Sequence, residues 1–278
     1  MALVALVAAL AAALYAPVFL SFRDTWLSFP EYNYGFAVPV VALYLLARRW
    51  RQLRAQPLEP EARGGLLLAA GLAVLLLGKA TGIHQADGVS FIPTALGLVW
   101  FLWGRGAARV VLFPVSYLLC GFGIVHSLHS DAGFALQQIT ARYAAVLANV
   151  LGAHAHRVGL VLTLGQHQFV VAQACSGLGA LLALLSLGWL IVGEGRDSLR
   201  TKALLVLAIA PLAVLANILR VALVLVLTQD VSPAVAEGFV HSAFSVSIFV
   251  LTLILLLALR KGLLWLDRST MGSSPVLS

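Results

Sequence analysis

The chain reads Gln173-Ala174-Cys175-Ser176-Gly177-Leu178 at the point where a long apolar segment begins. This order places one cysteine at the start of a predicted helix, with Ser176 as a candidate N-cap. The unpaired amides and the dipole of a helix start stabilise an anion, and they therefore favour the thiolate form of a nearby cysteine. A buried and unreactive cysteine is the alternative, because cysteine is among the residue types most often buried.

Two further residues are hard to explain as packing. Arg220 interrupts an apolar run, and His241 opens the next one. An arginine within the hydrocarbon costs at least about 2.5 kcal/mol on insertion scales, which indicates a function; snorkelling to the headgroups is the alternative. Asn217 lies three residues before Arg220 on the same helix face, where it can hold the guanidinium or cap a kink left by Pro211. Glu237 is close enough to His241 in sequence to orient its imidazole, although a solvated loop carboxylate is an equally open interpretation.

The composition is that of an integral membrane protein. Of the 278 residues, 61% are hydrophobic and only 10% are charged. Soluble globular chains are about half apolar and about a quarter charged. The net charge of +7 comes from basic residues scattered between apolar runs, a pattern that argues against nucleic-acid binding. Cys120 and Cys175 form neither a CxxC motif nor a disulfide framework, and we expect Cys120 to be a small buried hydrophobe.

A helical span needs about 20 apolar residues, and on that rule the chain has about eight spans. They are expected near residues 3–20, 35–47, 65–82, 89–103, 107–126, 177–193, 203–227 and 242–259. The first is interpreted as an uncleaved span rather than a removed signal peptide. Residues 1–268 are then a single transmembrane catalytic domain, and the tail 269–278 is expected to be disordered.

Loop charge gives the expected topology. Most of the 18 basic residues fall in four connections, as Arg48, Arg49, Arg51, Arg54, Arg63, Arg105, Arg109, Arg196, Arg200, Lys202, Arg260, Lys261 and Arg268. By the positive-inside rule these connections and both termini are cytoplasmic. The loops 21–34, 83–88, 127–176 and 228–241 are then extracytoplasmic. We expect Trp26, Tyr32 and Tyr34 in the first of these loops to form an interfacial aromatic belt, with a substrate groove as the alternative.

The longest outer loop contains its own structure. Apolar residues recur at helical spacing over 131–151, which predicts an amphipathic helix on the outer surface. A ninth span is the competing interpretation, but it would place the basic residues of every later loop outside. Two β-favouring runs, 160–164 and 167–171, flank Gly165-Gln166 and predict a short β-hairpin that leads to Cys175. The fold class is therefore an all-α polytopic membrane protein with one amphipathic helix and one hairpin.

This topology places Cys175, Arg220 and His241 at similar depth on the outer side. A thiol, a base and a fixed cation are the groups that acyl transfer requires: the thiolate attacks, the imidazole moves the proton, and the cation stabilises the oxyanion. No cofactor is expected. His126 with His129, and His154 with His156, lack the acidic partners of a metal motif, so no metal site is expected either.

Three sequence blocks resemble the motif blocks of the exosortase/archaeosortase family. They are Ala174-Cys175-Ser176-Gly177-Leu178, Asn217-Ile218-Leu219-Arg220 and Glu237-Gly238-Phe239-Val240-His241. The stretches Tyr34 to Pro39, Leu45 to Trp50 and Phe113-Pro114 are also similar. The resemblance covers most of the chain, from about Trp26 to the last span.

The resemblance implies a bacterial multi-pass cysteine transpeptidase of the inner membrane. Such enzymes recognise exported proteins by a C-terminal sorting signal, which consists of a short motif (often Pro-Glu-Pro), a transmembrane helix and a basic tail. They cleave there and pass the acyl group to a cell-surface acceptor. By this resemblance Cys175 is the nucleophile, Arg220 the transition-state stabiliser and His241 the general acid/base.

Two other functions remain open. Ser176 at a helix start also suits an intramembrane serine hydrolase. Arg220 could instead be the anion site of a non-enzymatic carrier, although no pair of Gly/Pro-broken helices in matched halves supports this. Alanine substitution of Cys175, Ser176 and Arg220 separates the three functions.

Overall fold

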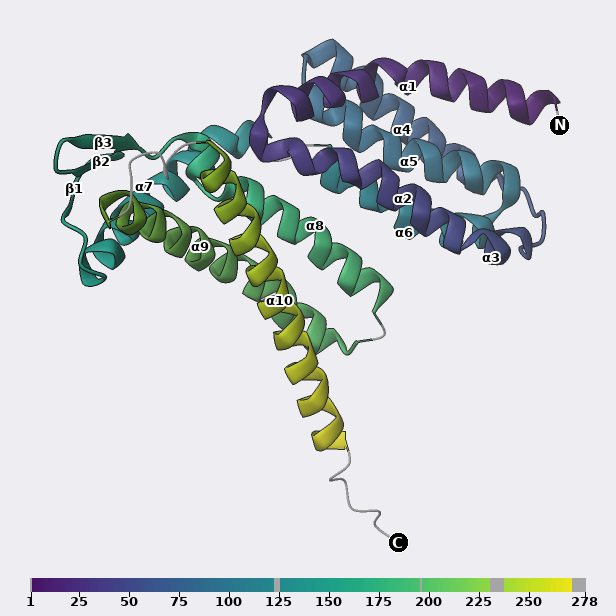
Figure 1. Ribbon diagram of the computed structural model, residues 1–278. Helices are drawn as coiled ribbons and strands as arrows, with labels where there is room; N and C mark the ends of the chain where they lie inside the picture. The colour runs from purple at the N-terminus through teal and green to yellow at the C-terminus, as the bar shows by residue number, and fades with distance from the viewer. Residues whose placement is uncertain (1, 123–125, 196, 231–237, 272–278) are drawn as a thin grey trace, which may run out of the picture. The chain divides into compact units, whose positions relative to one another are not determined.

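The computed structural model describes residues 2–122, 126–195, 197–230 and 238–271, which are mostly helical (Figure 1). The elements run α1 (Ala2–Ser28), η1 (Pro30–Phe36), α2 (Ala37–Arg48), α3 (Trp50–Arg54), α4 (Ala62–Thr81), α5 (His84–Trp103), α6 (Arg105–Tyr117), η2 (Leu118–Gly121), α7 (His126–Val150), β1 (Ala155–Val158), β2 (Val161–Leu164), β3 (His167–Val170), η3 (Gln173–Cys175), α8 (Leu178–Glu194), α9 (Leu199–Asp230) and α10 (Gly238–Met271), where η marks a 3₁₀ helix. They form two compact units, Met1–Ser127 and Leu128–Ser278.

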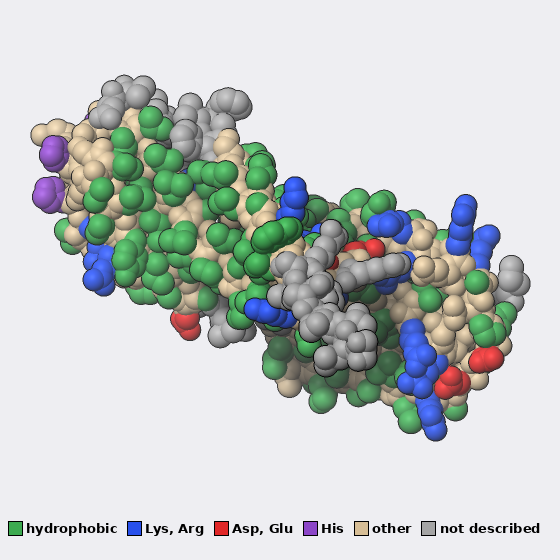
Figure 2. Space-filling view, turned by 90° about the horizontal axis from the view of Figure 1, so that it is seen from below, with side chains coloured by type: hydrophobic (Ala, Val, Ile, Leu, Met, Phe, Trp, Pro, Cys, Tyr) green, Lys and Arg blue, Asp and Glu red, His purple; other side chains and the backbone are tan. Residues whose placement is uncertain are grey.

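Within the part of the chain that the structure describes, four helices contain stretches long and apolar enough to cross a membrane. These stretches are Ala62–Thr81, Gln85–Trp103, Leu199–Gln229 and Val246–Asp267, and Leu178–Glu194 is a shorter apolar helix. Their outward faces carry large apolar side chains, and hydrophobic side chains cover much of the face drawn in Figure 2. Outward leucines on long helices are expected where lipid, rather than water, is the solvent. The number of eight spans stays a prediction.

Helices α4 and α5 pack directly against each other because glycines line their contact. Gly64, Gly71 and Gly78 recur every seven residues and so share one face of α4. A Cβ atom added at Gly64 or Gly71 would overlap backbone atoms of Phe101 or Thr94 on α5. Small residues let helix backbones approach closely in membranes, where no hydrophobic force draws helices together.

The predicted outer loops 21–34 and 83–88 are largely helical. Helix α1 continues to Ser28, and α5 already begins at His84. Hydropathy was a poor guide to these ends because it marks where a helix meets lipid, whereas the backbone hydrogen bonds continue through polar residues. The expected aromatic belt is wrong for Trp26 and Tyr32, which are 6% and 1% exposed. The indole of Trp26 donates instead to the carbonyl of Gly121, over 2.8 Å.

In the second unit the sheet has three antiparallel strands in the order β1-β2-β3, so the predicted hairpin is its β2–β3 half. Gly165 has a φ of 55°, as the tight β2–β3 turn requires. Strand β1, which the sequence analysis missed, is short and polar. Its position is fixed by Asn149, whose side chain accepts from the amide of Ala155 over 2.7 Å and donates to the carbonyl of Ala155 over 3.0 Å.

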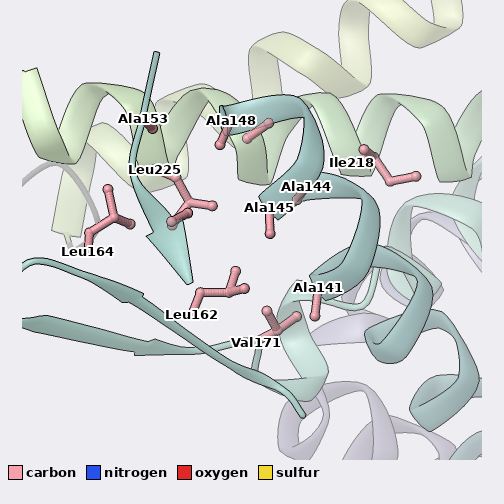
Figure 3. Packing of buried hydrophobic residues seen from close by; sticks show 12 residues of the cluster. Ala141, Ala144, Ala145, Ala148, Ala153, Leu162, Leu164, Val171, Ile218 and Leu225 are labelled. Carbon is pink, nitrogen blue, oxygen red and sulfur yellow. The ribbon is translucent and has the colours of Figure 1, made fainter. Parts of the chain in front are cut away.

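Helix α7 includes the predicted amphipathic helix and lies over this sheet. Its buried face consists mainly of alanines, which let Leu162 and Val171 of the sheet region approach from one side and Leu225 of α9 from another (Figure 3). Several larger apolar residues of the predicted helix face outward, with Val146 57% and Val150 77% exposed. Leu147 packs against the buried cluster instead, so the apolar residues of α7 lie on both of its faces.

Helices α8, α9 and α10 pack around a second apolar cluster that includes Leu184, Ile209 and Leu256. The connection between α8 and α9 is bound to α10 by charge. The carboxylate of Asp197 accepts two hydrogen bonds from Arg260, over 2.7 and 3.0 Å. Helix α10 continues to Met271, and residues 272–278 of the predicted tail lie outside the described residues.

Candidate active site at Cys175

Cys175 ends the short 3₁₀ helix η3, just before helix α8. The N-cap of α8 is Gly177, which has a φ of 84°, in the left-handed region that side chains disfavour, and which makes no side-chain cap hydrogen bond. The predicted N-cap at Ser176 is therefore wrong by one residue. The Oγ of Ser176 instead accepts a hydrogen bond from the amide of Leu178 over 3.2 Å, within the turn that precedes the helix. The chain turns sharply at Gly177, and Cys175 lies three residues before Leu178, the first residue of the helix.

Asn217 of α9 holds this turn from the other side. Its side-chain amide donates to the carbonyl of Cys175 over 3.0 Å and to the hydroxyl of Thr140 over 2.9 Å. The Thr140 hydroxyl lies 3.5 Å from the carbonyl of Ser176. Asn217 and Thr140 are 4% and 1% exposed. Hydrogen bonds shielded from water in this way fix the position of the Cys175 backbone.

These hydrogen bonds give Asn217 a role that neither sequence interpretation named, and its contact with the guanidinium stays a prediction. The position of Asn217 also explains why residue 177 has to be glycine. A Cβ atom there would lie 2.7 Å from the Cγ of Asn217, well inside contact distance. The amide and the cysteine turn can approach this closely only because Gly177 carries no side chain.

Cys175 and Arg220 line the same cavity, which has a volume of about 90 Å³. One wall comes from the sheet region and the other from α9, and the remaining lining residues are Leu162, Phe169, Val170, Val171, Val221, Val224, Leu225 and Thr228. The guanidinium and the sulfur therefore belong to side chains that border one largely apolar space. In so apolar a space a charge interaction is stronger than it is in water.

Arg220 also lines a second, smaller cavity of about 20 Å³ between α8, α9 and α10, together with Asn217 and Thr252. The Arg220 side chain therefore borders two cavities inside the protein, one on each side. The described structure thus brings together two of the three predicted catalytic residues.

His241 lies in the first turn of α10, which begins at Gly238. This agrees with its expected place at the beginning of an apolar helix. The side chain of His241 and all of Glu237 lie outside the described residues, so their predicted roles stay predictions.

Sequence reasoning missed two polar residues of this region, Thr140 and Thr228. Thr140 follows Gln137 by three residues on α7, and both side chains donate hydrogen bonds to backbone carbonyls on either side of Cys175. Gln137 donates to the carbonyl of Val171 over 3.1 Å, and Thr140 donates to that of Ser176 over 3.5 Å. Polar residues at this spacing within an otherwise apolar helix were the available signal. Among the described residues, no group of three or more His, Cys, Asp or Glu side chains could hold a metal ion.

The described geometry is that of a cysteine held at a helix start beside a membrane arginine. A protein-family model described as transmembrane exosortase matches residues 26–258. The chain belongs to the transmembrane exosortase family. The match includes all three blocks on which the resemblance rested. Searches of curated proteins and of solved structures returned no match. Membership in the exosortase family agrees with the apolar helices and implies a membrane-embedded transpeptidase.

Proposed function

We propose that this exosortase is a cysteine transpeptidase that cleaves a C-terminal sorting signal on exported proteins and transfers them to a cell-surface acceptor. The signal is a short motif followed by a transmembrane helix and a basic tail. The enzyme lies in the bacterial inner membrane with both termini in the cytoplasm and its active site near the outer face. The observation that supports this function most strongly is the cavity shared by Cys175 and Arg220.

The reaction has two acyl-transfer steps. In the first, the Cys175 thiolate attacks the scissile carbonyl, a C–S bond forms, and the oxyanion is stabilised by Arg220. The C–N bond then breaks, and the leaving amine takes a proton from His241. In the second step an acceptor nucleophile gives a proton to His241 and attacks the thioester carbonyl; the C–S bond breaks, and the thiolate and the protonated imidazole are restored.

The contacts of Ser176 argue against the serine hydrolase. Its side chain is 1% exposed, and its oxygen already accepts the amide of Leu178. A nucleophile has to reach the substrate, and a hydroxyl that is buried in a turn and bonded to a backbone amide cannot do so. For Arg220, the shared cavity with a thiol favours an oxyanion contact over the anion site of a carrier.

The test uses an exported reporter protein that carries a C-terminal signal taken from a protein of the same genome. Cells that express this exosortase should shorten the reporter, and mass spectrometry of its new C-terminus should show an adduct for transfer or a free acid for hydrolysis. Cys175→Ala should abolish shortening, and Ser176→Ala, the matched control, should keep most of it. Full processing by Cys175→Ala would overturn the proposed function.

A further inference from the structure

Thr228 differs from the other buried threonines on helices. Thr94 and Thr252 each donate their hydroxyl hydrogen to the carbonyl four residues earlier, over 2.8 and 2.7 Å. This back-bond is the usual arrangement for a threonine within a helix. Thr228 is 4% exposed, yet its hydroxyl has no hydrogen-bond partner among the described residues. A buried polar group without a partner costs free energy, so it needs an explanation.

The position of Thr228 supplies that explanation. It lines the same cavity of about 90 Å³ as Cys175 and Arg220. The other lining residues are apolar, so Thr228 is the one uncharged hydroxyl that the described lining offers to a bound molecule. A group that enters the cavity would give this hydroxyl the partner that it lacks among the described residues.

The distance along α9 indicates what kind of molecule fits. From residue 220 to residue 228 the helix rises about 12 Å at 1.5 Å per residue. An extended peptide covers that length with three or four residues, at about 3.3 Å each. The walls from the sheet region and α9 are mostly apolar, so Thr228 is positioned to bond a polar backbone group of such a segment.

We infer that Thr228 is a substrate-binding residue, whose hydroxyl hydrogen-bonds a backbone amide of the substrate three or four residues from the scissile carbonyl. Thr228 lies between Arg220 and Asp230, the C-terminal residue of α9. The loop charges place this end of α9 on the outer side of the membrane, so Thr228 lies farther out than Arg220. The exported part of the substrate also lies outside. Thr228 therefore contacts the acyl part, which stays bound in the thioester. This inference rests on the proposed function.

The experiment compares Thr228→Val, which replaces the hydroxyl by a methyl group of similar size, with Thr228→Ser, which keeps the hydroxyl. Purified full-length enzyme is assayed with the exported reporter described above. Thr228→Val should lower kcat/KM about tenfold, the usual effect of one lost hydrogen bond. KM should rise while kcat stays unchanged, because the contact is remote from the reacting atoms and equally strong in the bound ground state and in the transition state. Thr228→Ser should stay within about twofold of the parent.

Thermal unfolding provides a readout that separates binding from a structural role. Thr228→Val should raise Tm by about 2–4 °C, because it removes a buried hydroxyl that has no partner within the described part of the chain. Thr94→Val is the matched control, since Thr94 is equally buried but its hydroxyl is bonded to the carbonyl of Ser90 and to Tyr15. Thr94→Val should lower Tm.

Two outcomes would overturn the inference: an unchanged KM for Thr228→Val, or a lower Tm for Thr228→Val with normal activity per folded molecule. Cys175→Ala keeps these outcomes distinct from a failure of the proposed function. If Cys175→Ala is inactive while Thr228→Val behaves like the parent enzyme, only the inference fails. If Cys175→Ala still processes the reporter, the proposed function fails.

Discussion

The side-chain amide of Asn217 donates a hydrogen bond of 3.0 Å to the backbone carbonyl of Cys175, a residue 42 positions earlier in the chain. This contact joins helix α9 to the turn that carries the cysteine. Because Arg220 lies one helical turn after Asn217, the same helix fixes both the cysteine backbone and the cation. This hydrogen bond is therefore one of the contacts that set the position of the cysteine turn relative to Arg220.

We expect Asn217→Leu to lower kcat for reporter processing by about 10- to 100-fold, because the carbonyl of Cys175 loses its buried donor and the turn shifts. Thr140→Val, which removes only the second partner of Asn217, should have a smaller effect, and Thr140→Ser should restore activity. The rate at which iodoacetamide alkylates Cys175 reports on the position of the thiol. An alkylation rate and a kcat equal to those of the parent in Asn217→Leu would contradict this role.

Gly177→Ala tests the close approach of Asn217 to the cysteine turn. The new methyl group would occupy a left-handed backbone position and lie 2.7 Å from the Cγ of Asn217. Gly165→Ala in the β2–β3 turn is the control, since its φ is also positive but nothing lies within 4 Å of its added Cβ. We expect Gly165→Ala to cost about 1–2 kcal/mol in backbone strain. Gly177→Ala should cost more and abolish processing, as measured by thermal unfolding and the reporter assay.

Arg220→Met should lower kcat at least about 100-fold, because the oxyanion loses its charged donor in an apolar cavity. Arg220→Lys keeps the charge but loses the planar fork, so we expect an intermediate kcat. Arg142→Gln on α7 removes a cation that contacts only the Tyr143 ring among the interactions described, and it should leave kcat unchanged.

The ion pair between Asp197 and Arg260 should contribute measurably to stability. The Asp197 side chain is 5% exposed, and Arg260 donates two hydrogen bonds to it. We expect Asp197→Asn to lower the free energy of unfolding by about 1.5–3 kcal/mol. Asp24→Asn is the control, because its pair with Arg23 is exposed on both sides and contributes less than about 1 kcal/mol. Equal Tm values for the two variants would show that burial of the Asp197 pair adds nothing.

Sequence reasoning succeeded where the signal is local. The hairpin at 160–171 and the helix over 131–151 each depend on neighbouring residues, and each is present in the structure. The sequence-based prediction failed where burial determines the position of a side chain. Trp26 was expected at an interface, but it lies in the interior, bonded to a carbonyl 95 residues away. Composition cannot distinguish a tryptophan that faces headgroups from one that packs beneath a helix.

The amino-acid sequence by itself determined that this chain is a membrane protein, that a cysteine precedes an apolar helix, and that it belongs to the exosortase family. These properties follow from composition and from short motifs, which do not depend on distant contacts. Only the tertiary structure decided that Asn217 holds the Cys175 carbonyl and that Thr228 shares the cavity of Arg220. The physical reason is that a hydrogen bond or a cavity wall requires atoms from separate helices to meet within a few ångströms, and only packing of the whole second unit sets that distance.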